Sequence, residues 1–176
     1  MSIREDIRAG LEKDPATHSG FELFWTSPGL HAIWYYRLAH LLWKAKRRIL
    51  ARVLSNWAKF LTAIEIHPGA QIGKRLVIDH GVGVVIGETA VIGDDVLIYH
   101  GVTLGGKTLD PVKRHPTVGD RVILGAGSKL IGNITIGNDC RVGANAVVTK
   151  DMPAGTVAVG VNARLVNLTG DDYYLI

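Results

Sequence analysis

Histidine offers this chain its widest range of chemistry, and two of the seven histidines stand directly beside a charged residue. Asp79 precedes His80, Arg114 precedes His115, and Glu65 lies fifteen positions before His80. Because the pKa of histidine lies near neutrality, such a residue can act as a general base, and its neutral ring can also bind a metal ion. Composition alone leaves three interpretations open: a proton-transfer site, a metal site, or histidines that stand in turns and do no chemistry.

The charged neighbours favour proton transfer. The fixed positive charge of Arg114 opposes a divalent cation beside His115 and favours a carboxylate, which arginine binds through two parallel hydrogen bonds. The carboxylates of Glu65 and Asp79 are suited to holding an imidazole base and to binding an ammonium group. A base, a carboxylate-binding cation and an ammonium-binding anion together indicate a site for an amino acid.

These residues lie in a segment where an aliphatic residue returns every sixth position, often followed by glycine. The recurring positions are Ile66, Ile72, Ile78 and Val84, then Ile86, Ile92, Ile98 and Leu104, then Val118, Leu124, Leu130, Ile136, Val142 and Val148. A period of six fits neither a helix nor an alternating strand. It indicates a coil of short parallel strands, three per turn, with one aliphatic side chain of each strand filling the axis.

The period is interrupted twice. Val84 and Ile86 are only two residues apart, and Leu104 and Val118 are fourteen apart. The second interval, GGKTLDPVKRHPT, lacks the repeat, so we expect a loop that leaves the coil. Regular turns are enough to pack a coil, and irregular turns are therefore candidates for function. His80 falls in the first interruption and His115 in the second.

The residues before the coil are predicted to be helical. A short first helix ends at Asp14, because the residue before a proline avoids the helical region. Ser27 is the predicted N-cap of a second helical stretch, with Pro28 at its first position. We therefore predict an α+β chain, mainly β-solenoid: an N-terminal α-helical region (1–62), a parallel coil (63–160) and a C-terminal tail (161–176). Apolar residues recur at helical spacing at positions 3, 7 and 11, and then at 34, 38, 41, 42, 45, 49, 53, 57, 60 and 61.

Bulk composition narrows the class of protein. The 176 residues are 47% hydrophobic, enough for one domain with a real core, and no apolar run is long enough to span a membrane. The single cysteine, Cys140, excludes an intramolecular disulfide and is predicted to be buried. Without a signal-peptide pattern, we expect a cytoplasmic protein. Basic residues that we expect on a solvated helix face, next to an acidic ligand or partner rather than nucleic acid, are Lys44, Lys46, Arg47, Arg48 and Arg52.

Residues 10–165 resemble serine O-acetyltransferase, a family of acetyl-CoA-dependent enzymes with hexapeptide repeats. Hexapeptide repeats alone would indicate only an acyltransferase-like solenoid, whereas these motifs in this order are specific. The motifs are DPA (14–16), EIHPGAQIG (65–73), IDHGVGVVIGETAVIGDD (78–95), GVTLGG (101–106), KRHPTVGD (113–120), LGAGSKLIGNITIG (124–137) and VGANAVV (142–148). The resemblance implies a left-handed parallel β-helix and a reaction that forms O-acetyl-L-serine, the first step of cysteine biosynthesis from serine.

The resemblance also implies roles for the charged residues. His80 would be the general base that removes the proton of the serine hydroxyl, and Glu65 would hold its ring, where the family often has aspartate. Asp14 and Asp79 would bind the substrate ammonium. Arg114 would bind the carboxylate, and His115 would contact the substrate and the transition state. The implied acetyl-CoA contacts are Gly105, Gly106, Lys107, Ala126, Gly127, Arg141 and Ala144, and no metal is expected.

Partners follow from the same resemblance. Three-sided coils of this family form homotrimers with active sites between neighbouring coils, and pairs of trimers form hexamers; both assemblies stay open for this chain. The C-terminal Ile176 is expected to dock into O-acetylserine sulfhydrylase, since capture of a terminal carboxylate is a known mode of recognition. L-Cysteine is expected to act as a feedback inhibitor at the serine site. No membrane or nucleic-acid partner is expected.

Two groups of alternatives remain at this point. The nearest is another hexapeptide-repeat O-acetyltransferase, acting on homoserine, a sugar or an antibiotic hydroxyl. Homoserine differs from serine by one methylene, which a pocket distinguishes by only about 1–3 kcal/mol. A sugar would not need Asp14, Asp79 and Arg114. The other group is a metal protein of the γ-carbonic-anhydrase type or a solenoid scaffold without catalysis.

Overall fold

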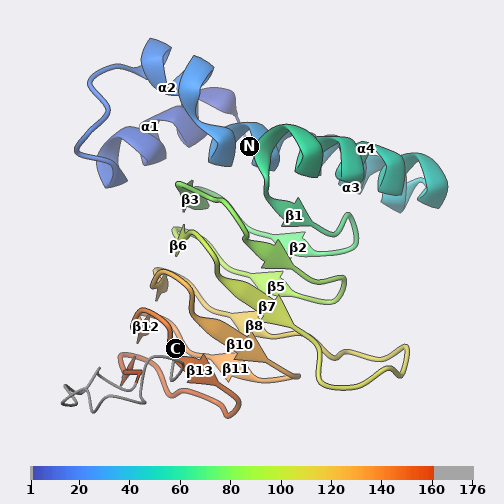
Figure 1. Ribbon diagram of the computed structural model, residues 1–176, viewed down its shortest axis with the longest axis vertical. Coiled ribbons are helices and arrows are strands. Elements are labelled where there is room, and N and C mark those ends of the chain that lie inside the picture. Colours follow the sequence, from blue (N-terminus) through green and yellow to red (C-terminus); the bar gives the residue numbers. More distant parts are fainter. Residues whose placement is uncertain (1, 161–176) are drawn as a thin grey trace, which may run out of the picture.

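The computed structural model describes residues 2–160, in which four helices lie across one end of a long coil of strands (Figure 1). The helices are α1 (Ile3–Lys13), α2 (Gly20–Thr26), α3 (Pro28–Lys44) and α4 (Arg48–Thr62). Ser27 caps α3 through its hydroxyl, and Pro28 follows as the first helical residue, as predicted. No helix among residues 2–160 combines the length and the apolar character needed to cross a membrane.

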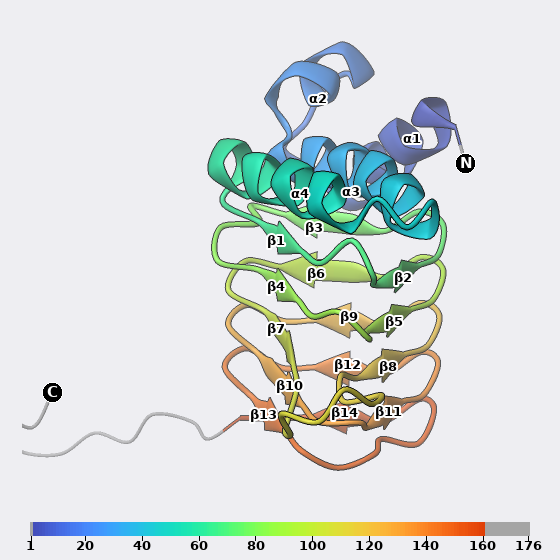
Figure 2. The ribbon, with the colours of Figure 1, turned by 90° about the vertical axis from the view of Figure 1, so that its right-hand side faces the viewer.

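The coil stacks its short strands into three parallel sheets, with one strand of each sheet in each of the first four turns (Figure 2). Their orders are β1-β4-β7-β10-β13, β2-β5-β8-β11 and β3-β6-β9-β12-β14. The strands are β1 (Glu65–Ile66), β2 (Gln71–Ile72), β3 (Val77–Asp79), β4 (Val85–Ile86), β5 (Val91–Ile92), β6 (Leu97–Tyr99), β7 (Thr103–Gly105), β8 (Thr117–Val118), β9 (Ile123–Leu124), β10 (Lys129–Ile131), β11 (Thr135–Ile136), β12 (Arg141–Val142), β13 (Val147–Val148) and β14 (Val157–Ala158). The predicted period of six is thus the step from one sheet to the next.

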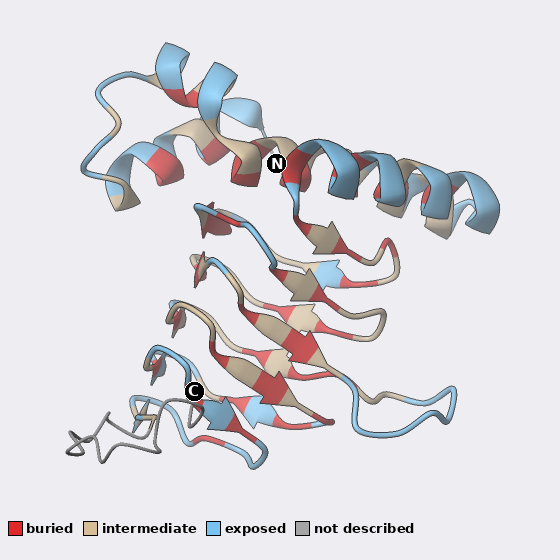
Figure 3. Ribbon diagram, viewed as in Figure 1, coloured by how far each residue is buried: buried red, intermediate tan, exposed pale blue. Residues whose placement is uncertain are grey.

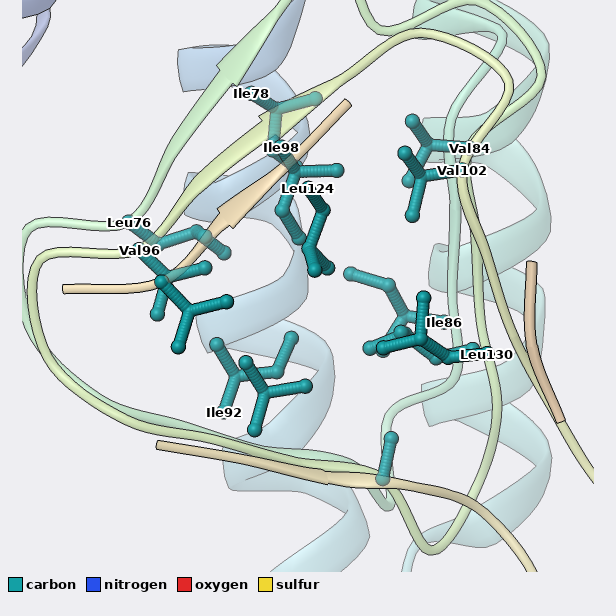
Figure 4. Close-up of a cluster of buried hydrophobic side chains, with 14 of the residues drawn as sticks. Leu76, Ile78, Val84, Ile86, Ile92, Val96, Ile98, Val102, Leu124 and Leu130 are labelled. Atoms are coloured by element: carbon teal, nitrogen blue, oxygen red, sulfur yellow. The ribbon is translucent and has the colours of Figure 1, made fainter. Parts of the chain in front are cut away.

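The aliphatic residues of the period fill the axis, as Figure 4 shows for several turns. One correction concerns Val84, which the period places in a strand. Ile86 occupies that strand position, and Val84 belongs to the preceding turn, in one column with Val102. Eight residues therefore separate Ile78 from Ile86 where the next turn needs six, from Ile98 to Leu104. The first interruption is an insertion of two residues.

One turn below Val102, the equivalent position holds a polar residue, Ser128. The backbone carbonyl of Ser128 accepts a hydrogen bond from the N–H of Thr103. Ser128 is fully buried, and its hydroxyl is the one buried side-chain polar atom among the described residues without a hydrogen bond. A buried hydroxyl without a partner costs about 1–3 kcal/mol. The coil therefore carries a small, local loss of stability at this turn.

Ser128→Ala is expected to raise the free energy of unfolding by about 1 kcal/mol, because it removes this unpaired group. The matched control is Ser55→Ala on α4, where the buried hydroxyl donates to the carbonyl of Ile66 at 2.7 Å. That change is expected to lower the free energy of unfolding by about 1 kcal/mol. Urea denaturation of both variants at one protein concentration measures the two effects, and equal signs would contradict this assignment.

Helix α4 turns an unexpected face to the coil. Small and hydroxyl-bearing side chains, at Ala51, Ser55, Ala58 and Thr62, are buried beneath it, because close approach to the first turn leaves no room for large groups. The long apolar stripe that helical spacing places on one face of the helix points the other way. Exposed apolar side chains along the outer surface of α4 are Ile49, Leu50, Val53, Trp57, Phe60 and Leu61 (Figure 3).

A buried ion pair joins helix α1 to α3. Asp6 is 1% exposed, and its carboxylate accepts from Arg37 of α3 at 2.5 and 2.7 Å and from the Trp34 indole at 3.1 Å. Ile3 and Leu11 of the predicted apolar face are half-exposed. Since Asp14 is the C-cap of α1, this buried pair also sets where Asp14 lies.

The second interruption is an excursion from the coil, as predicted. It leaves after β7 and returns at β8, and Figure 1 shows it projecting beyond the stacked turns. Leu109 near its tip is fully exposed, whereas His115 near its end is buried.

Candidate active site

Two corners of the coil carry the residues singled out in the sequence. The His80 corner connects the sheet that contains β3 (the β3 sheet) to the sheet that contains β4 (the β4 sheet). It comprises turns 79–84, 99–102, 125–128 and 143–146. The Arg114 corner lies at the opposite edge of the β4 sheet and comprises turns 67–70, 87–90, 105–116 and 131–134. Every turn of the coil therefore visits both corners.

A cavity of about 440 Å³ opens at the His80 corner, between the α1–α2 connection, the start of α3 and the end of β3. Asp14, Asp79 and His80 line it together, with Tyr99 from the turn below. A base and two carboxylates that are far apart in the sequence thus share one space. This is the part of the predicted amino-acid site that a single chain assembles.

The insertion of two residues explains the position of His80. Backbone hydrogen bonds align Val82 with His100, and His100 in turn with the position of Ala126, so His80 and Gly81 have no counterpart in the later turns. The His80 side chain is accordingly 73% exposed, with Nε2 3.9 Å from Asp79 Oδ2 and its ring 5.9 Å from that of His100. The irregular turn projects the histidine into the cavity.

Asp14 is held as an ionised group at the cavity wall. Its carboxylate accepts from the Thr17 hydroxyl at 2.5 Å and from the Ala16 N–H at 2.9 Å. These two hydrogen bonds, the hydroxyl first, hold the pKa of Asp14 below its usual range, and its electrostatic interaction with His80 contributes in the same direction. The DPA motif therefore closes the first helix and keeps a negative charge beside His80.

Glu65 lies on β1 next to this corner, and its carboxylate forms a salt bridge with Lys59 of α4 at 2.5 Å. Its backbone N–H donates to the carbonyl of Val84, in the turn that carries the insertion. Among residues 2–160 no hydrogen bond joins Glu65 to His80. The role of Glu65 in holding the His80 ring stays a prediction.

The Arg114 corner holds the other predicted substrate residues. Arg114 pairs with Glu88 at 3.0 Å, and His115, only 8% exposed, receives hydrogen bonds from Thr89. Burial, then the charges of Arg114 and Lys113, lower the pKa of His115, which keeps its ring neutral. Glu88 and Thr89 had no role assigned from the sequence, although both lie in the GETA stretch on which the resemblance rests.

The glycine next to these residues leaves space for the histidine ring. A Cβ built on Gly87 would lie 2.1 Å from Nε2 of His115, so any side chain at this position would displace the ring. A Cβ on Gly106 would lie 3.4 Å from the same Nε2. Gly106, a predicted acetyl-CoA contact, is therefore a direct neighbour of His115.

Six of the seven predicted acetyl-CoA contacts divide between the same two corners. Ala126, Gly127 and Ala144 stack below His100 in consecutive turns of the His80 corner. Gly105, Gly106 and Lys107 lie at the Arg114 corner, at and after the end of β7, and Arg141 is exposed on β12 of the β3 sheet. Both predicted sets, for the acceptor and for the acyl donor, are thus split in the same way.

One amino-acid molecule cannot touch both corners of a single chain. Gly101 belongs to the His80 corner and Gly106 to the Arg114 corner, with β7 between them. Five residues of extended chain span about 16 Å at 3.3 Å per residue. The structure therefore brings Asp14, Asp79 and His80 together, and Arg114 together with His115, but keeps the two groups apart.

Two other observations bear on metal ions and His67. Within residues 2–160, no three histidine, cysteine, aspartate or glutamate side chains converge as a metal site requires. Burial, followed by the charge of Arg52, lowers the pKa of His67 to about 4, and its Nδ1 accepts from the Gly69 N–H at 2.9 Å. This ring is a neutral acceptor inside its turn.

Comparison with known proteins extends these observations. Residues 115–150 match the family described as bacterial transferase hexapeptide (six repeats). The serine acetyltransferase of Mycobacterium tuberculosis is 56% identical over 165 residues, which are 94% of this chain and 72% of that protein. The serine acetyltransferase of Helicobacter pylori is 56% identical over 166 residues, which are 94% of this chain and 97% of that protein.

Solved structures give the same result. Soybean serine acetyltransferase complexed with serine is similar with a TM-score of 0.88 and 48% identity, over 93% of this chain and 68% of that one. The Brucella abortus enzyme in complex with coenzyme A has a TM-score of 0.88 and 40% identity, over 96% and 67%. Isoform 3 from Entamoeba histolytica, in complex with cysteine, has a TM-score of 0.88 and 40% identity, over 98% of this chain and 62% of that one.

These likenesses cover the helices as well as the coil, so they confirm the predicted fold of N-terminal helices followed by a left-handed parallel β-helix. Identity of 56% over nearly the whole chain, with almost the full length of the Helicobacter pylori relative covered, exceeds what a shared repeat alone would produce. The chain belongs to the serine acetyltransferase family.

Proposed function

We propose that this chain transfers the acetyl group of acetyl-CoA to the hydroxyl of L-serine, releasing O-acetyl-L-serine and CoA, as the first step of cysteine biosynthesis. The observation that carries the proposal is the cavity in which Asp14 and Asp79 flank an exposed His80. The two carboxylates bind the substrate ammonium, and the histidine lies beside them as a base. Family membership supports serine as the acceptor.

The reaction proceeds in a ternary complex. Nε2 of His80 takes the proton of the serine hydroxyl as the oxygen attacks the thioester carbonyl, and the C–S bond then breaks. The departing CoA thiolate receives the proton from the imidazolium, so the base is regenerated. Cys140, the one cysteine of the chain, is fully buried in the axis of the coil and is not placed to form an acyl-enzyme.

The complete site is shared by two subunits. Each chain carries both half-sites, at corners too far apart to meet within it, so the His80 corner of one copy joins the Arg114 corner of the next. Such a head-to-tail contact forms a closed ring when the rotation between neighbours is a whole fraction of a turn, and the family resemblance implies a threefold ring. A homotrimer satisfies every half-site, and it also brings the two groups of predicted acetyl-CoA contacts together.

The ring geometry accounts for the exposed stripe of α4. The two corners lie at the two edges of the β1-β4-β7-β10-β13 sheet. If both contact neighbouring subunits, this sheet faces the threefold axis. Helix α4 packs on β1 of that sheet and turns Val53, Trp57 and Phe60 outward. Three copies of the stripe then cover one another around the axis, which removes apolar surface from water.

Trp57→Asp is therefore expected to split the trimer, with the mass in light scattering falling about threefold, and to abolish acetyl transfer with it. The matched control is Phe21→Asp on α2, which is more exposed than Trp57, at 77% against 55%, but lies away from this sheet. The mass of the Phe21→Asp assembly in light scattering is expected to equal that of wild type. A monomeric and fully active wild type would contradict the shared site.

The first experiment on function is CoA release from acetyl-CoA with L-serine, L-homoserine, a sugar acceptor or no acceptor. Release that depends on L-serine, with weaker release on homoserine, is the expected result. Release that depends only on the sugar would replace the acceptor in this proposal, and no release from folded trimer would remove the proposed reaction altogether.

Further partners belong to the same proposal. L-Cysteine, which shares the ammonium and carboxylate groups of serine, competes for the same half-sites. The expected docking of Ile176 into O-acetylserine sulfhydrylase involves the tail, which lies outside the described residues. Pairing of two trimers into a hexamer and a cytoplasmic location stay predictions.

A further inference from the structure

The hydroxyl of Thr89 connects the GETA turn to the segment that carries Arg114 and His115. Its Oγ1 accepts from the backbone N–H of Arg114 at 3.0 Å and of His115 at 3.1 Å. The same oxygen lies 2.9 Å from Nδ1 of the His115 ring, and the backbone N–H of Thr89 donates to this Nδ1 at 3.2 Å. One side chain thus makes three contacts with the two residues that are predicted to bind substrate.

The protons of this network can be assigned from its geometry. A backbone N–H only donates, so Nδ1 of His115 must present a lone pair to Thr89. The Thr89 oxygen already accepts two N–H groups, which leaves its own proton to donate to Nδ1. The neutral ring of His115 therefore carries its proton on Nε2.

Nε2 is the atom of His115 that the fold leaves for substrate. It makes no hydrogen bond within residues 2–160, and its nearest glycine positions, Gly87 and Gly106, keep side chains away from it. The oxygens of a bound amino-acid carboxylate, and the oxygen that gains charge at the acetyl carbonyl, are all acceptors. An Nε2–H donor stabilises such atoms, whereas the other tautomer would point a lone pair at them.

We propose that Thr89 is a positioning residue that locks His115 in the Nε2–H tautomer, so that His115 donates a hydrogen bond to an oxygen of the reacting substrates. The inference rests on the proposed acetyl transfer and deepens it. Thr89 acts through His115 and touches no substrate itself. The role requires a hydroxyl at this position, so serine preserves it and valine, of the same shape as threonine, removes it.

The fold tolerates the loss of the hydroxyl because a second set of hydrogen bonds holds residues 113–116 in place. The Lys113 ammonium donates to the carbonyls of Thr89 at 2.7 Å, His115 at 2.5 Å and Pro116 at 3.2 Å. These contacts involve backbone oxygens and persist in Thr89→Val. The variant is expected to keep the 113–116 segment in place while freeing the tautomer.

The test compares wild type, Thr89→Val and Thr89→Ser as trimers labelled with ¹⁵N-histidine, with His115→Gln used to assign the resonances. Two-bond ¹H–¹⁵N spectra are expected to show His115 protonated on Nε2 in wild type and in Thr89→Ser, and a shift toward the tautomer average in Thr89→Val. kcat/KM for serine is expected to fall on the order of tenfold in Thr89→Val, the loss of about one hydrogen bond, and to recover in Thr89→Ser.

The spectra need no acetyl transfer, so they separate this inference from the proposed function. Protonation of His115 on Nδ1 in wild type, or an unchanged tautomer in Thr89→Val, would overturn the role of Thr89. An Nε2–H ring in a trimer that releases no CoA with serine would leave the tautomer assignment standing, but would overturn its use in this reaction.

Discussion

Replacing His80 with asparagine is expected to lower kcat for serine acetylation by about 10²–10⁴-fold, the usual contribution of a general base. Asparagine is the appropriate substitution because His80 has a φ of 58°, in the left-handed region that asparagine adopts readily. The side chain is largely exposed, so the corner keeps its fold. Initial rates of CoA release at saturating serine and acetyl-CoA measure the loss.

The control for this substitution is His100→Ala. His100 is an exposed histidine one turn below, with its ring 5.9 Å from that of His80, but it belongs to a regular turn. We expect the His100→Ala variant to retain most of the wild-type activity. A His80→Asn trimer with kcat near that of wild type would remove His80 from the mechanism, and equal losses in both variants would indicate a shared structural effect.

The second large effect is expected for Arg114→Ala, with kcat/KM for serine lower by about 10²–10³-fold. Removing one member of a hydrogen-bonded charge pair costs about 2–5 kcal/mol, because the remaining charge is left without its partner. Two charges are affected by this substitution, the carboxylate of the substrate and that of Glu88, which pairs with Arg114 at 3.0 Å. Steady-state kinetics with varied serine measure the change, and the KM for acetyl-CoA is expected to stay near its wild-type value.

Ethanolamine, which is serine without its carboxylate, supplies the matched control for Arg114. Wild type is expected to prefer serine strongly over ethanolamine, and Arg114→Ala to lose most of that preference. If the preference survives the substitution, a different residue binds the carboxylate. Glu88→Gln, which leaves Arg114 in place, is expected to affect serine far less than Arg114→Ala does.

The fold was predictable because a single physical requirement repeats along the chain. Each strand must place one aliphatic side chain on the axis, and residues such as Ile92, Ile98 and Leu124 record that requirement directly in the sequence. The same regularity made the interruptions visible. The period places Val84 in the wrong column because an aliphatic residue also fills the turn before most strands of that sheet, as Val102 does before β7, and spacing alone does not separate the two columns.

The arrangement of the site was harder to predict. Helical spacing showed that Trp57 and Phe60 share a face, but not that small residues would take the side toward the coil and leave these two exposed. The division of the site also depends on which edge of the β1-β4-β7-β10-β13 sheet each turn occupies. The hydroxyl of Thr89 had no sequence signal of its own, since a threonine in a turn is common and its function depends on a segment 25 residues away.

The measurement that tests the shared site most directly is complementation between His80→Asn and Arg114→Ala. Each variant leaves the opposite half-site intact, and the two are co-expressed with different tags and purified as mixed trimers. Every mixed trimer, whichever variant contributes two of its subunits, holds one intact site in three, so the purified mixed trimers should recover about one third of wild-type serine-dependent CoA release. Recovery to this level from two nearly inactive variants would establish a site built by neighbouring subunits. If the mixed trimers form and stay as inactive as their parents, His80 and Arg114 do not meet across an interface, and the proposal of a site shared between subunits is wrong.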